Sequence, residues 1–247
     1  MIHIFTDNFT DTQVRITGDD YNHLSNVLRV QTGEDILVSD GHGRDVIAAI
    51  AEIKDHEIIA DIIRENAVEV ELDCRIVLYQ ALPKSDKMDY IIQKCVELGV
   101  YEIVPVETAR CIVRLDDKTR QKKVERWRKI AESAAKQSQR SKIPEISSVM
   151  SYKEAITDAQ KLSRRVVPYE HTDSLEELKS LLKDAREHKM DSVGIFIGPE
   201  GGFDEKEVET AASAGIEPIS LGHRILRTET AGMALISAIM LELESGI

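Results

Sequence analysis

The spacing of hydrophobic positions changes near residue 70, and this change predicts two different kinds of domain. Before it, short apolar segments alternate with turns, which is typical of strands. The expected strands cover residues 2–5, 14–17, 36–39, 46–53 and 58–63. One short helix is expected to begin at Asp19. Its apolar positions have a helical spacing and are Leu24, Val27 and Leu28. Several short strands with one helix predict a small β-barrel-like domain.

From Arg75 onward, strands alternate with longer helices, which predicts an α/β domain with a mainly parallel sheet. The expected strands cover residues 76–82, 102–106, 165–169, 193–197 and 216–221. The expected helices cover residues 86–98, 118–140, 175–186, 204–214 and 228–244. We expect the junction at Asn66–Asp73, and therefore one domain over residues 1–70 and a second over residues 73–247.

The distribution of apolar residues around two of these helices predicts how each helix packs. The helix over residues 118–140 carries an apolar stripe, so it is expected to dock that stripe and turn its basic residues to solvent or phosphate. The stripe consists of Val124, Trp127, Ala131, Ala134 and Ser138. Trp127 is interpreted as a core anchor rather than a platform for a base. The last helix is apolar on nearly every side over residues 231–243, which favours a homodimer interface as well as burial in the core.

Composition narrows the class of protein. The chain has 247 residues, 42% hydrophobic and 31% charged, which is typical of a folded protein with a sizeable core. No stretch of 18 residues is free of charge, and no secretory signal opens the sequence, so we expect neither a membrane span nor export. The three cysteines, Cys74, Cys95 and Cys111, show no C-x-x-C spacing. We therefore expect no disulfide framework, no zinc site and a cytoplasmic location.

The distribution of charge matters more than its sum. The formal net charge of −12 argues against a nucleic-acid partner, but residues 110–142 hold 12 basic and 4 acidic residues. A local positive patch on an acidic protein can still bind phosphate, because salt screens each charge over about 8–10 Å. The alternative is an ordinary solvated helix face.

Two glycine-containing loops follow apolar strands. The first, Gly198–Gly202, is followed by an acidic helix start, and the second is Leu221–Arg227. Ligands of α/β proteins bind at the carboxyl ends of strands, so two such loops can form the walls of one pocket. Neither a Gly-Lys-Ser/Thr nor a G-x-G-x-x-G motif is present, and the acidic helix start favours an uncharged or cationic ligand group over a phosphate. The alternative is a pair of tight turns without a ligand.

The second loop carries mixed chemistry. Ile225 and Leu226 could face an aromatic ring. Arg227 and Glu229 are candidates for the polar chemistry of the site, and the alternative is that they only pair with each other. Thr228 or Thr230 is expected to cap the following helix. A third strand end, over residues 78–84, leads to Lys84 and Lys87, where a polyanion could be contacted. The seven histidines are scattered, so a metal site has no support.

Six segments together resemble the SPOUT superfamily of methyltransferases and, more closely, the bacterial 16S rRNA uridine-N3 methyltransferase family (RsmE type). The segments are His23–Val30, Asp40–Gly43, Gln93–Val100, Glu125–Arg140, Gly198–Gly202 and Leu221–Ala231. They occur in the family's order and span nearly the whole chain. The sequence is therefore identified as a member of this family.

The resemblance implies an N-terminal PUA-like RNA-binding β-barrel domain and a C-terminal α/β methyltransferase domain with a deep trefoil knot. It also implies a homodimer that acts on 16S rRNA of the small ribosomal subunit, with S-adenosylmethionine as cofactor and no metal or membrane partner. The residues implied in cofactor binding are Leu82, Ile197, Gly198, Pro199, Glu200, Gly201, Gly202, Leu221, Gly222, Ile225, Leu226 and Arg227. The residues implied in RNA binding are Arg29, Lys84, Arg110, Arg114, Lys122, Lys123, Arg126 and Arg140.

Methylation at N3 of uridine requires loss of the N3 proton, because that nitrogen is protonated at neutral pH. Either a general base removes the proton or a cation stabilises the developing oxyanion. Arg227 and Arg110 are the candidate cations, and Glu200 or Glu229 is the candidate base. Alternatives are a SPOUT enzyme acting on a different RNA, a non-catalytic RNA-binding protein, and a metabolic α/β enzyme using a small nucleotide.

The sequence departs from the family pattern at two positions. His3 stands where the family often has arginine, and Cys111 follows Arg110 where the family usually has serine. An RNA contact by residue 3 and a hydroxyl role for residue 111 are therefore not carried over.

Overall fold

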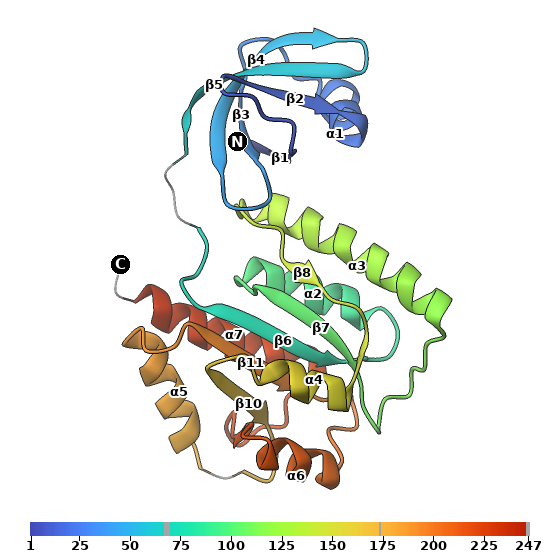
Figure 1. Cartoon of the computed structure of the whole chain (residues 1–247), viewed down its shortest axis with the longest axis vertical. Helices are drawn as coiled ribbons and strands as arrows, with labels where there is room; N and C mark the ends of the chain where they lie inside the picture. The colour runs from blue at the N-terminus through green and yellow to red at the C-terminus, as the bar shows by residue number, and fades with distance from the viewer. Residues whose placement is uncertain (67–69, 173, 246–247) are drawn as a thin grey trace. The chain divides into compact units, whose positions relative to one another are not determined.

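The computed structural model describes residues 1–66, 70–172 and 174–245, and it divides the chain into two compact units (Figure 1). Unit 1 consists of Met1–Glu71 and Ala135–Ile143, and unit 2 consists of Leu72–Ala134 and Pro144–Ile247. Residues 67–69 of the expected junction lie outside the described residues.

Unit 1 is built on a strongly curled five-stranded sheet. Its strands are β1 (Ile2–Phe5), β2 (Gln13–Thr17), β3 (Asp35–Ser39), β4 (Asp45–Lys54) and β5 (Glu57–Glu65). In the order β1-β3-β4-β5-β2, the first pair is parallel and the other three pairs are antiparallel. The β4–β5 register shifts after Ile47 and after Ile50, and such bulges increase the twist of a sheet. All five expected strands are confirmed.

The expected helix of unit 1 forms, but its second half is wider than an α-helix. Its parts are α1 (Gly18–Asn22) and a π-helical turn, η1 (His23–Leu28). The turn ends at Arg29, which has a left-handed backbone with φ of 54°. A π-turn contains more residues than an α-turn and rotates the following side chains out of the α-helical spacing. Leu24 is buried, whereas Val27 is 67% and Leu28 is 43% exposed, so the expectation of one shared apolar side is wrong.

Residues Ala135–Ile143 belong to unit 1, although they include the end of a helix, α3 (Asp117–Gln137), that begins in unit 2. The carbonyl oxygen of Lys136 lies 3.3 Å from Nδ1 of His3, and Oγ of Ser141 donates to Oδ2 of Asp45 at 2.6 Å. These hydrogen bonds are buried or partly buried, so they fix the segment to the sheet of unit 1. Nothing in the hydrophobic pattern indicated this return.

Unit 2 is an α/β domain whose sheet has only parallel pairs. Its strands are β6 (Arg75–Ala81), β7 (Glu102–Glu107), β8 (Glu145–Ile146), β9 (Met150–Ser151), β10 (Arg164–Pro168), β11 (Ser192–Ile197) and β12 (Glu217–Ile219). The order is β12-β10-β11-β6-β7-β8, and β9 also pairs with β7. The helices are α2 (Lys87–Glu97), α3 (Asp117–Gln137), α4 (Tyr152–Ala159), α5 (Glu176–Arg186), α6 (Glu205–Ser213) and α7 (Thr228–Glu244).

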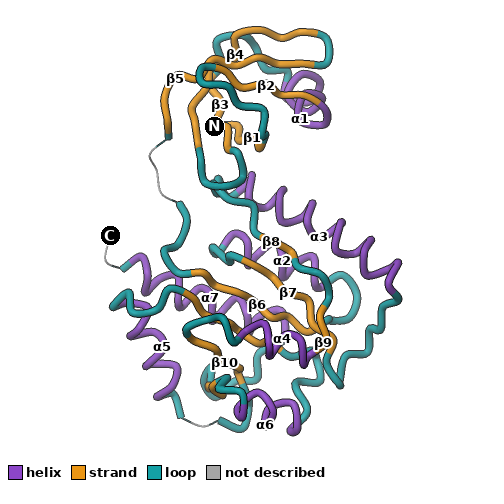
Figure 2. The backbone as a smooth tube through the Cα atoms, in the orientation of Figure 1, coloured by secondary structure: helices purple, strands orange, loops and turns teal. Residues whose placement is uncertain are grey.

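Helices cover both faces of this sheet (Figure 2). On one face, Val77 and Tyr79 of β6 pack in a cluster with Ile156 of α4 and Val208 of α6. On the other face α7 lies so close that a Cβ on Gly232 would meet Ile197 and Leu78 at 3.5 Å. Alternate residues of β6 thus face opposite helix layers, which explains why this strand is apolar on both faces from Ile76 to Leu78.

The five expected strands and five expected helices of unit 2 are confirmed, with shifted ends. The helix expected to reach Arg140 ends at Gln137. Four residues of its predicted stripe are buried, with Trp127 only 3% exposed, whereas Ser138 lies beyond the helix and is half-buried. The short elements β8, β9 and α4 were not predicted. The last helix is not buried on every side within one chain, because Leu241 is 60% exposed.

Candidate functional site

The candidate site lies at the carboxyl edge of the parallel sheet in unit 2. Ile197, the last residue of β11, pairs with Gln80 of β6, and Ile219 of β12 pairs with Pro168 of β10. The strands run parallel, so the segments that follow them leave from the same edge. These segments contain both predicted glycine loops.

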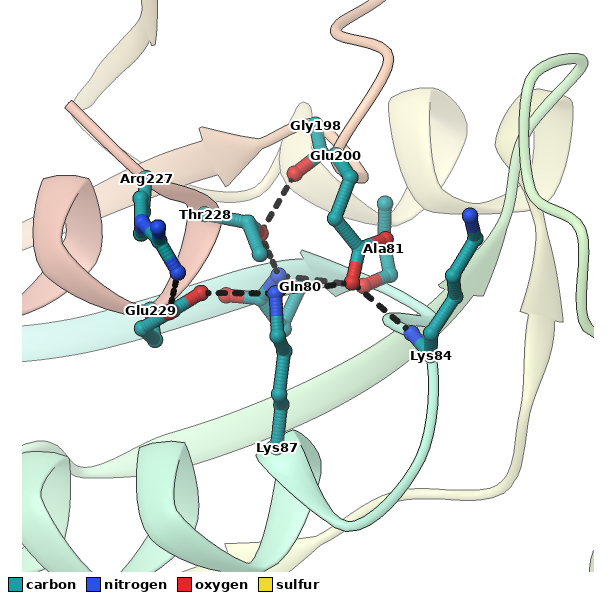
Figure 3. Close-up of polar contacts among 9 residues, drawn as sticks. All are labelled: Gln80, Ala81, Lys84, Lys87, Gly198, Glu200, Arg227, Thr228 and Glu229. Carbon is teal, nitrogen blue, oxygen red and sulfur yellow. Dashed lines mark hydrogen bonds and ion pairs between the residues drawn. The ribbon is translucent and has the colours of Figure 1, made fainter. Parts of the chain in front are cut away.

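Gln80 and Thr228 fasten three elements together at this edge (Figure 3). The fully buried Gln80 donates from Nε2 to Oγ1 of Thr228 at 3.0 Å, and Oγ1 of Thr228 donates to the carbonyl oxygen of Gly198 at 2.6 Å. The prediction that Thr228 or Thr230 caps α7 is wrong: the cap residue is Arg227, without a side-chain cap bond. The Thr228 hydroxyl instead holds the first glycine loop against the start of α7.

The first glycine loop is compact and closes on itself. A Cβ on Gly198 would lie 3.1 Å from the backbone of Gly202 and Phe203, so a side chain at this position would push the loop open. The N–H of Gly202 donates to the carbonyl oxygen of Pro199 at 2.9 Å, and Gly202 has a φ of +66°. Both glycines are therefore needed for the turn itself. Gly201 is exposed, and its carbonyl oxygen accepts a hydrogen bond from Arg110.

The second glycine loop exposes its backbone. Gly222 turns the chain with a φ of +99°, and its N–H donates to Oγ of Ser220 at 3.2 Å. Within the described residues, no hydrogen bond is found for the backbone of residues 223–226. Leu226 is half-buried, whereas Ile225 is 85% exposed, which is unusual for so large an apolar side chain. Unpaired backbone groups beside apolar side chains are suited to binding the edge and face of an aromatic ring.

Two carboxylates meet one ammonium group between the loops (Figure 3). Nζ of Lys87, at the start of α2, lies 3.0 Å from Oε1 of Glu200 and 3.3 Å from Oε2 of Glu229. Oε1 of Glu200 also accepts from the backbone N–H of Lys84 at 3.1 Å. Arg227 approaches Glu229 only to 4.0 Å, and its side chain is 81% exposed.

These contacts shift the pKa values of Glu200 and Lys87. Partial burial raises the pKa of Glu200, but its own N–H, Lys87 and the N–H of Lys84 outweigh that effect, so the pKa lies below its usual value. The hydrogen bond that the Lys87 ammonium donates to Glu200 is the main reason that the pKa of Lys87 is raised. Glu200 is therefore a carboxylate and Lys87 an ammonium at neutral pH.

Arg110 lies on the other side of the first glycine loop. Its Nη1 donates to the carbonyl oxygen of Gly201 at 3.0 Å, and its Nη2 lies 3.4 Å from Oδ2 of Asp204. Asp204 caps α6 in a reciprocal arrangement with Glu207, which also accepts from the N–H of Ala109 at 2.7 Å. The start of α6 thus holds both the loop and the segment that carries Arg110.

The structure brings only some of the predicted catalytic residues together. Glu200, Glu229 and Arg227 share one cluster, whereas Arg110 is bound to Gly201 and Asp204. The predicted pairing of Arg227 with Glu229 is present only at 4.0 Å. Leu82, Ile197 and Pro199 of the predicted cofactor set are buried, whereas Leu221 is half-buried.

The predicted RNA-contacting residues of unit 2 differ in their exposure and in the contacts that their side chains make within the chain. Lys84 and Lys122 are exposed, and exposed Arg114 donates to the carbonyl oxygen of Ala109. Lys123 lies 5.8 Å from the centre of the Trp127 ring. Arg126 pairs with Asp89 on α2.

Two residues of unit 1 that the sequence analysis considered for RNA contacts, Arg140 and His3, are buried. Arg140 is 4% exposed and its Nη2 lies 2.6 Å from Oε2 of Glu71, so the expectation that it faces RNA is corrected: it holds the returning segment. His3 is 7% exposed and its Nε2 lies 2.6 Å from Oγ of Ser39, while burial lowers its pKa. Arg29, by contrast, is exposed.

Sequence reasoning missed the structural roles of Gln80 and Lys87. A glutamine inside an otherwise apolar strand was a usable signal, since a buried amide needs partners. Lys87 was expected to contact a polyanion, but two carboxylates of the chain occupy its ammonium group. Cys111 is buried, and its Sγ lies 3.2 Å from Oγ1 of Thr108.

Two further findings concern metal sites and membrane spans. Among residues 1–66, 70–172 and 174–245, no three His, Cys, Asp or Glu side chains are grouped to hold a metal ion. Across the same residues, no helix combines the length and apolar character required to cross a bilayer.

Comparison with known families matches both units. A family described as an RNA methyltransferase domain matches residues 70–240, and a family described as an RNA methyltransferase PUA domain matches residues 16–63. These matches define the class as an RNA methyltransferase with a PUA domain.

Individual relatives narrow the class. Ribosomal RNA small subunit methyltransferase E of Bacillus subtilis (strain 168) is 35% identical over 230 residues, which are 93% of this chain and 90% of the relative. The Neisseria gonorrhoeae protein of the same name, solved bound to S-adenosyl methionine, is 33% identical with a TM-score of 0.84 and 96% of each chain covered. A putative methyltransferase from Legionella pneumophila, solved with the cofactor SAM, is 28% identical with a TM-score of 0.85 over 96% of each chain. The chain belongs to the ribosomal RNA small subunit methyltransferase E family.

Proposed function

We propose that this protein transfers a methyl group from S-adenosylmethionine to N3 of a uridine in the 16S rRNA of the small ribosomal subunit. The observation that carries the proposal is the pair of glycine loops at one sheet edge, Gly198–Gly202 and Leu221–Arg227, held together by Thr228. Family membership supplies the substrate class, because the Bacillus subtilis relative is named for the RNA of the small subunit.

The residues at this edge fit S-adenosylmethionine. The unpaired backbone of residues 223–226 and the apolar side chains of Ile225 and Leu226 match the edge and faces of an adenine ring. The two carboxylates of Glu200 and Glu229 outnumber the one ammonium group of Lys87 between them, and this excess favours a cationic sulfonium over a phosphate. When bound, this cofactor supplies an electrophilic methyl group.

The chain's own residues then have to position the uridine and stabilise its anion. Arg227 is exposed and held by no short contact within the described chain, so its guanidinium is available to a developing oxyanion at O2 or O4. Arg110 is anchored by Gly201 and Asp204 and offers a second cation at the other side of the loop. In-line placement of the reacting atoms supplies most of the remaining rate gain.

Glu200 and Glu229 are proposed to position groups rather than to remove the proton. A carboxylate with a lowered pKa is a weak general base, and Glu200 is bound by Lys87 and by the N–H of Lys84. Its contacts join the loop after β6 to the loop after β11.

RNA binding is proposed for both parts of the chain. Lys84, Arg114, Lys122 and Lys123 form the basic surface of the methyltransferase domain, and Arg29 contributes from the PUA-like domain. Phosphate contacts from such residues give affinity that decreases with salt.

The finer architecture is also a proposal. We place a PUA-like domain over residues 1–70 and a SPOUT domain with a trefoil knot over residues 73–247. A cytoplasmic homodimer is the proposed working form. The exposed apolar side chain of Leu241 on α7 supports a subunit interface on that helix.

The test is transfer of labelled methyl from S-adenosylmethionine to ribosomal particles from a strain that lacks the homologous gene. We expect label in small subunits and none in large subunits. Equal label in large subunits would point to a SPOUT enzyme with a different RNA target. Binding of rRNA without any binding of S-adenosylmethionine would favour a non-catalytic RNA-binding protein.

A further inference from the structure

Lys87 lies between the two glycine loops but has no assigned role in the proposed reaction. It begins α2, and its ammonium group lies between a carboxylate of the first glycine loop and a carboxylate of the first turn of α7 (Figure 3). The distances from Nζ are 3.0 Å to Glu200 and 3.3 Å to Glu229. One side chain thus bridges two elements that are 29 residues apart in the chain and that both border the site.

The bridge competes with a second cation for the same carboxylate. Arg227 lies two residues before Glu229, yet its Nη1 approaches Oε1 only to 4.0 Å, and the arginine side chain is 81% exposed while that of Glu229 is 17% exposed. Lys87 therefore neutralises Glu229 from the inner side, and Arg227 remains in solvent. Without Lys87, Arg227 would be the one ion-pair partner left to Glu229 among the described residues.

We propose that Lys87 is a positioning residue of this site: its ammonium group holds Glu200 and Glu229 and keeps Glu229 from binding Arg227, so that the Arg227 guanidinium stays available to the RNA substrate. This inference rests on the proposed methyl transfer for its consequence in catalysis. The bridge itself is a property of the free protein.

The protein offers a matched control on the same helix. Lys94 pairs with Glu97 at 2.8 Å, and its side chain is 33% exposed, compared with 31% for Lys87. Lys87→Met and Lys94→Met thus each remove a similarly exposed, ion-paired lysine from α2. Only the first faces the two glycine loops. Lys87→Arg keeps the positive charge and serves as the conservative variant.

The first measurement is the reactivity of Arg227 toward phenylglyoxal in the free protein, followed by peptide mass spectrometry. We expect rapid modification in wild type, Lys94→Met and Lys87→Arg. In Lys87→Met, pairing of Arg227 with Glu229 should slow its modification by about three-fold, the scale of an exposed ion pair. Unchanged reactivity of Arg227 in Lys87→Met would overturn the proposal.

The second measurement is single-turnover methyl transfer with saturating S-adenosylmethionine. Lys87→Met should lower the rate by about ten-fold, with the dissociation constant of S-adenosylmethionine changed by less than about two-fold, and Lys87→Arg should restore most of the rate. An equal loss in Lys94→Met, or no rescue by Lys87→Arg, would overturn the positioning role. If wild type itself transfers no methyl group, the proposed function fails, whereas the reactivity of Arg227 still decides whether the bridge exists.

Discussion

Arg227 and Arg110 each carry a guanidinium group at the glycine loops, but the surroundings of the two side chains differ. Arg110 is held by the carbonyl oxygen of Gly201 and by Asp204, whereas Arg227 extends into solvent with Glu229 4.0 Å away. An anchored cation can orient a loop and a substrate at a fixed point. A free cation can follow a substrate that arrives. The proposed mechanism assigns the stabilisation of the oxyanion first to Arg227.

Arg227→Ala is expected to lower turnover by about 100-fold, the loss typical of removing one electrostatic contact to a developing oxyanion. The melting temperature should stay near that of wild type, because the side chain is 81% exposed. Turnover is measured as methyl groups transferred to small subunits. Arg224→Ala removes an exposed cation from the same loop and is the control. Near-wild-type turnover of Arg227→Ala would remove that residue from the mechanism.

Glu200→Gln separates charge from shape at the first glycine loop. The amide can still accept from the N–H of Lys84, so turnover should stay within about ten-fold of wild type if Glu200 only positions groups. A loss of several orders of magnitude at neutral pH would instead identify Glu200 as the general base.

The same variant has a defined effect on stability. The pKa of Glu200 is lower in the folded protein than its usual 4.5, so the ionised group stabilises the fold above that value. This contribution is lost as pH falls through the folded-state pKa. Melting temperatures measured from neutral pH downward should therefore differ between wild type and Glu200→Gln near neutrality and converge below pH 4.5. A constant difference at all pH values would contradict the proposed ion pair.

At the scale of elements, α3 joins an apolar stripe to a basic face. Val124, Trp127 and Ala131 are buried, so the stripe positions the helix, and Lys122 remains exposed. The hydrophobic spacing predicted this orientation because period and burial are directly linked. Which basic residues stay free was not predictable, because it depends on tertiary partners such as Asp89 for Arg126 and Glu71 for Arg140.

Charge reversal of Lys122 and Lys123 to glutamate tests the basic face. Affinity for 16S rRNA should decrease, and the slope of log affinity against log salt should become shallower by about 1 to 2, which is the loss of two phosphate contacts. The same reversal at Lys179 and Lys183 on α5 changes the net charge equally and should leave the slope unchanged. An identical slope for wild type and the α3 variant would make this face an ordinary solvated surface.

The glycine loops were predictable because a strand end, a glycine and a helix start follow one another in the sequence. The ties between them were not, since Thr228 contacts Gly198 across 30 residues and Lys87 contacts Glu200 across a longer separation. The strands β8 and β9 were missed because two residues carry no recognisable period. The π-turn η1 was missed because Leu24, Val27 and Leu28 have the spacing of an α-helix in the sequence, and that spacing does not reveal a locally wider turn.

At the scale of the whole molecule, the chain is not divided at one point. Residues Ala135–Ile143 rejoin unit 1, where Arg140 and Lys142 bind Glu71. A contiguous assignment of residues 1–70 to the first domain leaves this segment out. Excision of residues 1–70 would therefore remove Asp45, the hydrogen-bond partner of the buried Ser141, and leaving a buried hydroxyl unpaired is costly.

The proposed homodimer is the second property at this scale. Leu241 is 60% exposed on a helix that is otherwise rich in apolar residues, so its side chain is available for a contact with a second subunit. Leu241→Glu should shift the sedimenting species from dimer to monomer, whereas Ile63→Glu, at a position 54% exposed on β5, should leave the dimer intact. A wild-type protein that sediments as a monomer would contradict the proposal.

The central claim is that the loops of unit 2 direct a methyl group to N3 of a uridine. The most direct test is mass spectrometry of nucleosides from small subunits that lack this modification, after incubation with the protein and isotopically labelled S-adenosylmethionine. The account predicts labelled 3-methyluridine as the product. Label in another methylated nucleoside, or methyl on the ribose, would contradict it.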